Sequence, residues 1–464
     1  MINFWAAGIN AMPTLLPFVT LRQERFGAIL FNPYLGIEVE LDPLETYIAS
    51  LCNGQNSCRQ VEDAFQERFR LSQAEKDGYI SKTAEKLANA FSFTFNKGIE
   101  NEMPILPKIM TFSEDDPYLS APRNAIWDVT YACNLSCPHC LTSSGKIHKD
   151  ELRTQQALFL IDKLAEAKIL TLSLSGGEPF MRPDILQLLR YISRTNMRVD
   201  IATNGVMLDE NILMGLKELP VFQVQVSIDG MNDAHDRFRG RKGAFDAACH
   251  TIQRLTEEQI AVSISTTATS ENLGSIDQII DLAVDLGCSN FKAISFMPAG
   301  RGKKNADRLK LGREEYFALC RILIERSQEL RGVLNISTDT CLSFLLQPPP
   351  TEMYQNGPMG CSAGYDTLSI GADGTAYPCP FLHEIPLGNL MDLPLHYIWN
   401  KSPTMNVLRS LQKQDMEEPC KNCKYAPLLC KGGCRASAYL ECGNLNGADA
   451  ICSKRESNGL YHAA

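Results

Sequence analysis

The stretch CNLSCPHC, residues 133–140, places Cys133, Cys137 and Cys140 at Cys-x3-Cys-x2-Cys spacing. It directly follows an apolar strand candidate at 126–130. Thiolates are the usual protein ligands of iron–sulfur clusters, and a cubane [4Fe–4S] cluster takes four ligands. Three cysteines on one short loop therefore predict a cluster in which one iron stays open to a small molecule. A structural zinc site is the competing interpretation of this spacing.

Downstream of the loop, strand and helix candidates alternate through 125–296. Apolar strand candidates lie at 170–174, 199–202, 222–228, 262–266 and 291–296, with helical stretches between them at 154–167, 183–194, 244–257 and 276–286. Alternation at roughly 30-residue spacing predicts βαβ units and a parallel sheet that closes partly into a TIM-type (β/α) barrel. The predicted fold class is therefore α/β, with the chemistry at the C-terminal ends of the strands.

Several strand candidates end in glycine-rich or polar motifs. Ser-Gly-Gly-Glu-Pro at 175–179, Ala-Thr-Asn-Gly at 202–205 and Val-Ser-Ile-Asp-Gly at 226–230 each close a strand, and His-Asp-Arg-Phe-Arg follows at 235–239. Glycine permits close approach of the backbone to a ligand, and a carboxylate suits an ammonium group. Taken singly, each motif also fits an ordinary strand–helix turn or a surface polar network. Their order along the chain is more specific than any one of them.

The cysteine loop and these motifs together resemble the radical S-adenosylmethionine (SAM) superfamily. The resemblance implies that SAM chelates the open iron and that an electron from the cluster cleaves SAM. The 5′-deoxyadenosyl radical released in this way then abstracts hydrogen from a substrate. By the same resemblance, SAM contacts come from Gly176, Gly177, Glu178, Asn204, Ser227, Asp229 and Arg239, the last of which could instead bind a substrate anion. The sequence identifies no catalytic acid or base.

A second group of cysteines lies near the C-terminus, in a segment with little regular periodicity. Its spacing resembles the SPASM extension of radical SAM enzymes, which carries two auxiliary [4Fe–4S] clusters, although the usual five-residue gap is six residues here, between Cys423 and Cys430. The resemblance implies one cluster on Cys420, Cys423, Cys430 and Cys452 and another on Cys361, Cys379 and Cys434. Cys341 or Cys442 would complete the latter, or its fourth position is open for substrate. A zinc ribbon is the alternative.

The N-terminal segment has strand candidates at 18–21, 28–31 and 37–41, followed by three helices. Each helix opens with a capping-box pair: Asp42 with Glu45, Ser57 with Gln60, and Ser72 with Glu75. This α+β, winged-helix-like unit resembles a PqqD-like recognition element for ribosomally made precursor peptides (RiPPs). The resemblance implies that a leader peptide adds as a strand beside 37–41, facing the helix at 58–69. A DNA-binding winged helix is the competing interpretation, but Arg59, Arg68 and Arg70 are offset by Glu62, Asp63 and Glu67.

The composition narrows the classes of function. The chain has 464 residues and a formal net charge of −9, and this diffuse negative charge argues against nucleic-acid and membrane-surface partners. No apolar run approaches the roughly 20 residues that span a bilayer, and no export signal is recognisable at the N-terminus. Clustered cysteines predict metal ligands in a reducing compartment rather than disulfides. We therefore expect a cytoplasmic protein.

The resemblance covers nearly the whole chain and divides it into four parts. These are a recognition element at 14–103, a linker at 104–122, a radical SAM core at 123–335 and a Cys-rich SPASM domain at 336–464. It implies an oxidoreductase with SAM and three [4Fe–4S] clusters, which a flavodoxin- or ferredoxin-type protein reduces. The expected activity is modification of a leader-containing precursor peptide, by thioether or carbon–carbon crosslinking, decarboxylation or excision.

Two other functions remain open. The tail at 420–439 and the motif Pro-Ala-Gly-Arg-Gly at 298–302 are also similar to radical SAM enzymes that trim tetrapyrrole side chains. A non-catalytic iron–sulfur protein, serving electron transfer or peptide binding, is the alternative from another class. The intact cysteine triplet and Glu178 disfavour it.

Overall fold

The computed structural model describes residues 9–96, 103–112, 119–337, 361–423, 425, 430 and 432–453. The chain forms two compact units. The first comprises Met1–Arg123 with the segments Asp162–Thr171 and Ile192–Arg198, and the second comprises the rest. In the described part of the chain, no helix combines the length and apolar character needed to cross a bilayer.

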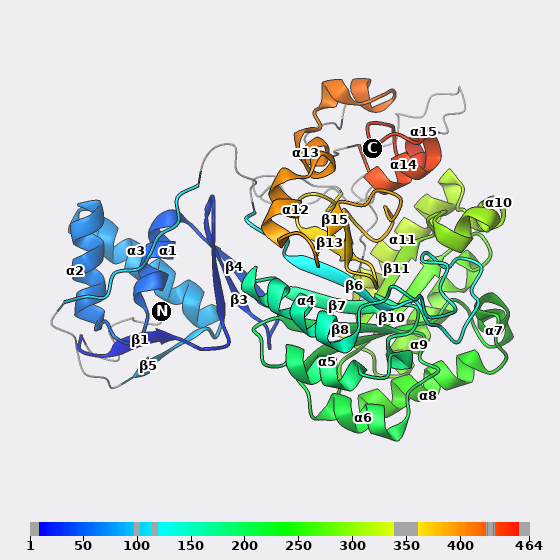
Figure 1. Ribbon diagram of the computed structural model, residues 1–464, viewed down its shortest axis with the longest axis horizontal. Helices are drawn as coiled ribbons and strands as arrows, with labels where there is room; N and C mark the ends of the chain where they lie inside the picture. The colour runs from blue at the N-terminus through cyan, green and yellow to red at the C-terminus, as the bar shows by residue number, and fades with distance from the viewer. Residues whose placement is uncertain are drawn as a thin grey trace. The chain divides into compact units, whose positions relative to one another are not determined.

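The first unit contains two small antiparallel sheets. Strands β2 (Thr20–Glu24), β3 (Gly27–Asn32) and β4 (Ile37–Leu41) pair in the order β2-β3-β4 (Figure 1). The three predicted strands are thus confirmed, with small shifts at their ends. A second sheet pairs β1 (Met12–Leu15) with β5 (Phe93–Asn96), and the sequence pattern did not predict it.

Three helices complete this unit: α1 (Pro43–Leu51), α2 (Cys58–Phe69) and α3 (Gln73–Asn89). All three predicted capping boxes are present, so each helix begins where a local side-chain pair satisfies free backbone N–H groups. The helices and the three-stranded sheet bury a shared apolar core that includes Leu30, Leu41, Ile48, Leu51, Val61, Phe65, Ile80 and Leu87.

The second unit is built on one ten-stranded sheet with the order β12-β11-β10-β9-β8-β7-β6-β13-β14-β15. Its first seven strands in sequence are β6 (Asn124–Thr130), β7 (Thr171–Gly176), β8 (Arg198–Thr203), β9 (Val221–Ser227), β10 (Val262–Ala268), β11 (Asn290–Ser295) and β12 (Asn335–Ser337). Neighbours from β8 to β12 pair in parallel. The predicted α/β class and parallel sheet are confirmed. Because β12 and β15 are separate ends of the sheet, the barrel is partial.

Helices alternate with these strands. They are α4 (Thr154–Glu166), α5 (Ile185–Ile192), α6 (Glu210–Lys217), α7 (Asp233–Arg239), α8 (Ala244–Glu257), α9 (Ile276–Asp285), α10 (Ala306–Leu309) and α11 (Arg313–Glu329). Figure 1 shows α5, α6 and α8 along the outer side of the strands. This arrangement leaves the C-terminal strand ends, where the cysteine loop and the polar motifs begin, free for a site.

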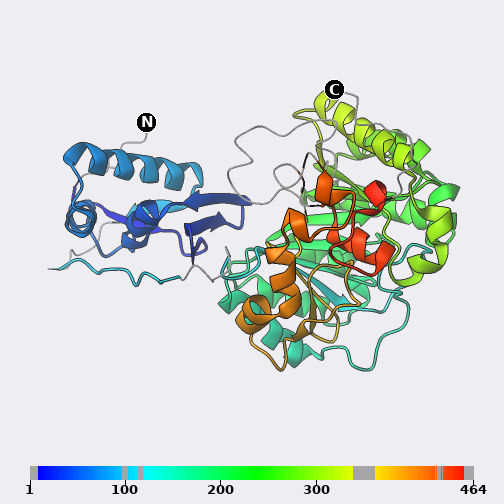
Figure 2. The same cartoon turned by 90° about the horizontal axis from the view of Figure 1, so that it is seen from above.

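The C-terminal segment extends the same sheet, which the sequence pattern did not predict. Strand β13 (Thr367–Ile370) pairs in parallel with β6, and β14 (Thr375–Tyr377) and β15 (Gly388–Asn389) follow in antiparallel order. Four short helices come next: α12 (Leu395–Lys401), α13 (Pro403–Ser410), α14 (Arg435–Cys442) and α15 (Ala450–Ser453). Figures 1 and 2 show these orange and red helices over one side of the barrel.

Candidate functional site

The three-cysteine loop leaves the C-terminal end of β6 and is held at its base by the backbone. The Cys133 N–H donates to the Gly145 carbonyl at 2.9 Å, and the Cys140 N–H donates to the Cys137 carbonyl at 3.3 Å. Burial, followed by the charge of neighbouring groups that include Cys137, raises the pKa of Cys133 to about 11. The thiol is therefore protonated near neutral pH, and a metal that binds it as thiolate has to displace the proton.

Gly176 and Gly177 lie directly against the start of this loop. The Gly177 N–H donates to the Thr130 carbonyl at 2.8 Å, and the next N–H donates to the Ala132 carbonyl at 2.8 Å. A Cβ at Gly176 would collide with the Thr130 carbonyl oxygen, and one at Gly177 with that of Ala132. Gly176 also has φ +124°, which disfavours other residues. The glycines thus position the cysteine loop, whichever contact they make with SAM.

The Glu178 carboxylate is fully buried and joins the ends of two strands. It accepts hydrogen bonds from Thr203 Oγ1 at 2.8 Å, the Asn204 N–H at 2.8 Å and the Phe180 N–H at 3.2 Å. Burial raises its pKa to about 7 despite these donors. The structure therefore gives Glu178 a positioning role between β7 and β8. Its direct contact with the SAM ammonium group stays a prediction.

Asn204 links the end of β8 to the cysteine loop. Its Nδ2 donates to Asn134 Oδ1 at 2.7 Å and lies 3.9 Å from the Cys133 sulfur. Its Oδ1 accepts the Val206 N–H at 2.9 Å, which fixes the amide orientation. Ser227 ends β9, half-buried and opposite Ser265 of β10. Both residues lie at the strand ends where the sequence motifs placed them.

Asp229 and Arg239 form a buried ion pair beside the cysteine loop. Arg239 Nη2 lies 2.5 Å from Asp229 Oδ2, and Arg239 Nη1 donates to the Cys137 sulfur at 3.8 Å. Burial pushes the pKa of Asp229 upward, but the Arg239 charge and smaller contributions, among them the Thr267 N–H, together outweigh it, so the pKa is below its usual value. Arg239 therefore places a positive charge on a predicted cluster ligand, a contact that the sequence pattern did not predict.

His139 lies within the cysteine loop and closes one side of this ion pair. Its ring stacks on Phe238, with centroids 4.5 Å apart and planes 13° apart, and its Nε2 lies 3.7 Å from Asp229 Oδ2. Burial lowers the pKa of His139 to about 4, so the imidazole is neutral at physiological pH. The contact with Asp229 is therefore not a charged pair under these conditions.

A second arginine, Arg301, clamps the loop from the segment after β11. The guanidinium Nε donates to the Cys137 carbonyl at 2.8 Å, and Nη1 donates to the Ser144 carbonyl at 3.2 Å. The backbone N–H of Arg301 donates to the Cys140 carbonyl at 3.0 Å. The Pro-Ala-Gly-Arg-Gly motif at 298–302 supplies this clamp. The sequence pattern singled out the motif but not this contact with the loop.

The C-terminal cysteines fall into two spatial groups. A hydrogen bond with Cys434 raises the pKa of Cys361 well above its usual value, and Cys361 in turn adds to the effect of burial on the pKa of Cys379. Burial raises the pKa of Cys430, and the nearby Cys420 and Cys423 add to this effect. Burial also raises the pKa of Cys452 to about 12, with Cys420 and Cys430 among the other causes. Cys361 thus lies near Cys434 and Cys379, and Cys420 lies near Cys430 and Cys452, while the binding of a cluster by each set stays a prediction.

The candidate fourth ligands differ in what the structure can say of them. Cys341 lies outside the described residues. Cys442 ends α14 in an exposed position, where its thiol donates to the Ala438 carbonyl at 3.1 Å. A ligand role for Cys442 beside Cys361 stays a prediction.

The predicted cluster ligands are cysteine side chains throughout, and thiolates are the usual protein ligands of iron–sulfur clusters. Among the described residues, no three His, Cys, Asp or Glu side chains lie close enough to share a single metal ion.

Comparison with known proteins assigns both parts of this site. The Radical SAM superfamily model matches residues 127–283, and the SPASM model, an iron–sulfur cluster-binding domain, matches residues 361–424. The chain is 30% identical to the AdoMet-dependent heme synthase of Methanosarcina barkeri, over 72% of this chain and 97% of that one. It is 32% identical to the mycofactocin maturase MftC of Mycolicibacterium smegmatis, over 72% and 83%.

A solved structure is similar over more of the chain. The crystal structure of Streptococcus suis SuiB bound to its precursor peptide SuiA superimposes with a TM-score of 0.72, covering 95% of this chain and 100% of that one. The two sequences are 18% identical, so this likeness concerns the fold.

Proposed function

The chain belongs to the radical SAM superfamily and carries a SPASM iron–sulfur domain, and on that premise we propose that this enzyme modifies a ribosomally made precursor peptide. The observation that carries the proposal is the N-terminal α+β unit in front of the barrel. The likeness to peptide-bound SuiB covers 95% of the chain, whereas the curated relatives match about 72% of it. The name of the mycofactocin maturase supports the same class of substrate.

Among the described strands, β4 pairs only with β3, and its other edge, called the free edge below, is the proposed place for the leader peptide. The other edge of the sheet, β2, is bordered by the following chain, because Gln23 binds the backbone of Lys108 and Met110 at 3.0 and 2.6 Å. On β4 the Glu40 carbonyl accepts a hydrogen bond from Lys86 Nζ at 2.9 Å, so it points away from β3. By alternation, the backbone groups of Glu38 and Glu40 face a partner strand.

In the barrel, the chain's own residues would hold and orient the cofactors. Cys133, Cys137 and Cys140 would bind the cluster that, with SAM, supplies the 5′-deoxyadenosyl radical. The two glycines and Glu178 hold the loop against β6, β7 and β8. Arg239 donates to the Cys137 sulfur, and Arg301 fixes the backbone carbonyls of Cys137, Cys140 and Ser144. Cys137 and its contact with Arg239 are buried, and excluding water from a site protects a radical formed there.

The leader-binding part of the proposal is tested by Glu38→Pro, with Glu38→Ala as the matched control. Both variants lose the ion pair of Glu38 with Arg123, but only proline removes an N–H from the free edge, where the fold tolerates it. We expect Glu38→Pro to lose affinity for a short peptide encoded beside the gene, while Glu38→Ala keeps it. Equal affinity of all three proteins would refute β4 as the binding edge.

A second candidate function is the processing of tetrapyrroles. The 30% identity to a heme synthase along 97% of that enzyme favours it. The two functions are separated by supplying the anaerobically reconstituted protein with SAM, dithionite and either the neighbouring peptide or an iron tetrapyrrole. We expect a mass change in the peptide only; a changed tetrapyrrole with an unchanged peptide would reverse the assignment.

A further inference from the structure

A basic segment follows β11 and stands out from the rest of the chain. Residues 301–313 contain six Lys or Arg residues and one acidic residue, Asp307, in a chain whose net charge is −9. The basic residues are Arg301, Lys303, Lys304, Arg308, Lys310 and Arg313. The reaction proposed above uses only Arg301, so most of this positive charge has no assigned role.

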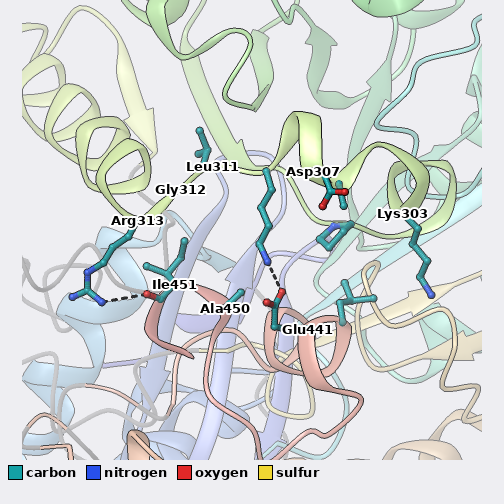
Figure 3. Close-up of a pocket in the computed structure, with 12 residues that line it drawn as sticks. Lys303, Asp307, Leu311, Gly312, Arg313, Glu441, Ala450 and Ile451 are labelled. Carbon is teal, nitrogen blue, oxygen red and sulfur yellow. Dashed lines mark hydrogen bonds and ion pairs between the residues drawn. The ribbon is translucent and has the colours of Figure 1, made fainter. Parts of the chain in front are cut away.

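The segment lines a cleft of about 610 Å³ shared with the C-terminal helices. Figure 3 shows Lys303, Asp307 and Arg313 on the barrel side of the cleft, facing Glu441 and Ile451. The cleft therefore lies between the basic segment and the helices α14 and α15, and α15 carries Cys452.

Both ends of the basic segment contact residues next to predicted cluster ligands. At one end Arg301 binds the carbonyls of Cys137 and Cys140. At the other end Arg313 Nη1 donates to the Ile451 carbonyl at 3.3 Å, and the next residue is Cys452. A molecule seated on this segment would thus lie beside the two places where the chain is expected to hold iron.

Lys310 pairs with Glu441 within the cleft, but the other cations that could meet a partner are only weakly committed within the chain. Lys303 pairs with Glu384, and Arg308 pairs with Glu271 at 3.2 Å, but all four side chains are between 39% and 53% exposed. Lys304 is exposed as well. Exposed ion pairs contribute only about 0–1 kcal/mol, so carboxylates of another protein can replace them at little cost.

We propose that this basic segment, 301–313 with the cleft beside α15, is the docking surface for an acidic protein that carries single electrons, such as a ferredoxin. The proposal rests on the radical SAM activity, which needs one electron for each SAM cleaved. In the docked complex one electron would pass from the reduced carrier to the cluster that Cys452 would help to hold, and no bond would form or break. Complementary charge favours a rapid, weak encounter, as electron transfer requires.

The test compares a double charge reversal, Lys304→Glu with Arg308→Glu, with the single reversal Lys401→Glu on the exposed end of α12. The probe is a plant-type [2Fe–2S] ferredoxin of net negative charge. Its binding in the oxidised form to reconstituted protein is measured by isothermal titration at low and high salt. The rate of 5′-deoxyadenosine formation is then measured with reduced ferredoxin and, separately, with dithionite.

We expect the double variant to bind ferredoxin about tenfold more weakly at low salt and to lose ferredoxin-driven turnover to a similar extent. Its dithionite-driven rate and iron content should match those of the parent protein and of Lys401→Glu. Unchanged ferredoxin binding would overturn the proposal. Loss of the dithionite-driven rate as well would also overturn it, because the segment would then serve the fold or an acidic part of the substrate peptide. Absence of activity in the parent protein would instead count against the proposed function.

Discussion

The two cysteine-rich regions of this protein are built in different ways. The loop at 133–140 is held by hydrogen bonds that need no metal, and their partners are Gly145, Asn204, Arg239 and Arg301. These contacts come from four separate places in the sequence and leave the loop few alternative positions. The barrel therefore prepares its site before a cluster is bound.

The C-terminal region has less to hold it. Among the described residues around the second set of cysteines, the buried apolar cluster consists of Met416, Cys420 and Ala448, with Leu411 and Cys452 partly buried against it. Two polar side chains, Arg435 and Asp449, provide most of the other cross-links. Where the apolar core is this small, metal binding supplies part of the folding free energy. The difference predicts that losing a ligand has separable consequences in the two regions.

The largest effect is expected from Cys133→Ala. Formation of 5′-deoxyadenosine under dithionite should fall about 10³-fold or more, because the open-iron cluster loses one of its three ligands. The barrel should nevertheless keep its far-ultraviolet circular dichroism and its protease resistance. Cys434→Ala, in contrast, should make the region 361–453 sensitive to limited proteolysis. Equal protease resistance of the two variants would remove the distinction between the regions.

The next largest effect is expected from Asp449→Ala. The buried Asp449 carboxylate accepts the Cys434 N–H at 2.7 Å, the Ser437 hydroxyl at 3.1 Å and the Ile451 N–H at 3.0 Å. Leaving these donors unpaired should cost about 3 kcal/mol, distributed over the C-terminal helices. Hydrogen exchange followed by mass spectrometry should show faster exchange in 432–453 and no change in 124–145. Faster exchange in both regions would contradict the separation.

Much of the fold was predictable because the signals are local. The capping boxes at Asp42, Ser57 and Ser72 depend on residues three positions apart, and all three helices begin there. The alternation of strands and helices likewise determined the α/β class. The pairing of β1 with β5 and the addition of β13 beside β6 were not predictable, because each joins segments far apart in the chain.

The same distinction applies to the site. Motif order placed Gly176, Asn204 and Asp229 at the ends of neighbouring strands, since parallel strands share one C-terminal edge. Which way a side chain turns there depends on partners that spacing cannot reveal. Glu178 turns toward Thr203, and Arg301 reaches back across about 160 residues to the Cys137 carbonyl.

The variant Glu178→Gln tests whether water reaches the buried carboxylate of Glu178. Burial raises the pKa of Glu178 to about 7 from its usual 4.5, so its contribution to stability is complete below pH 4.5 and is lost as the pH rises through 7. Between pH 4.5 and pH 8, the free energy of unfolding of the parent protein should therefore fall by about 3 kcal/mol relative to that of the variant. Guanidinium unfolding of both proteins across this range checks the difference. Parallel curves would mean that water reaches the carboxylate.

The smallest effect is expected when each region loses the planar group of its own arginine. Arg301→Lys removes two guanidinium contacts from the cysteine loop, but the glycines, Asn204 and Arg239 remain, and the charge is kept. Arg301→Lys should lower the free energy of unfolding by about 1 kcal/mol. The variant should still carry the iron of three clusters after gel filtration. Arg435→Lys removes contacts to the Leu445 and Gly447 carbonyls, which have fewer substitutes, so iron should be lost from the C-terminal sites first. If Arg301→Lys lost iron as readily, the loop would depend on its metal just as the C-terminal region does.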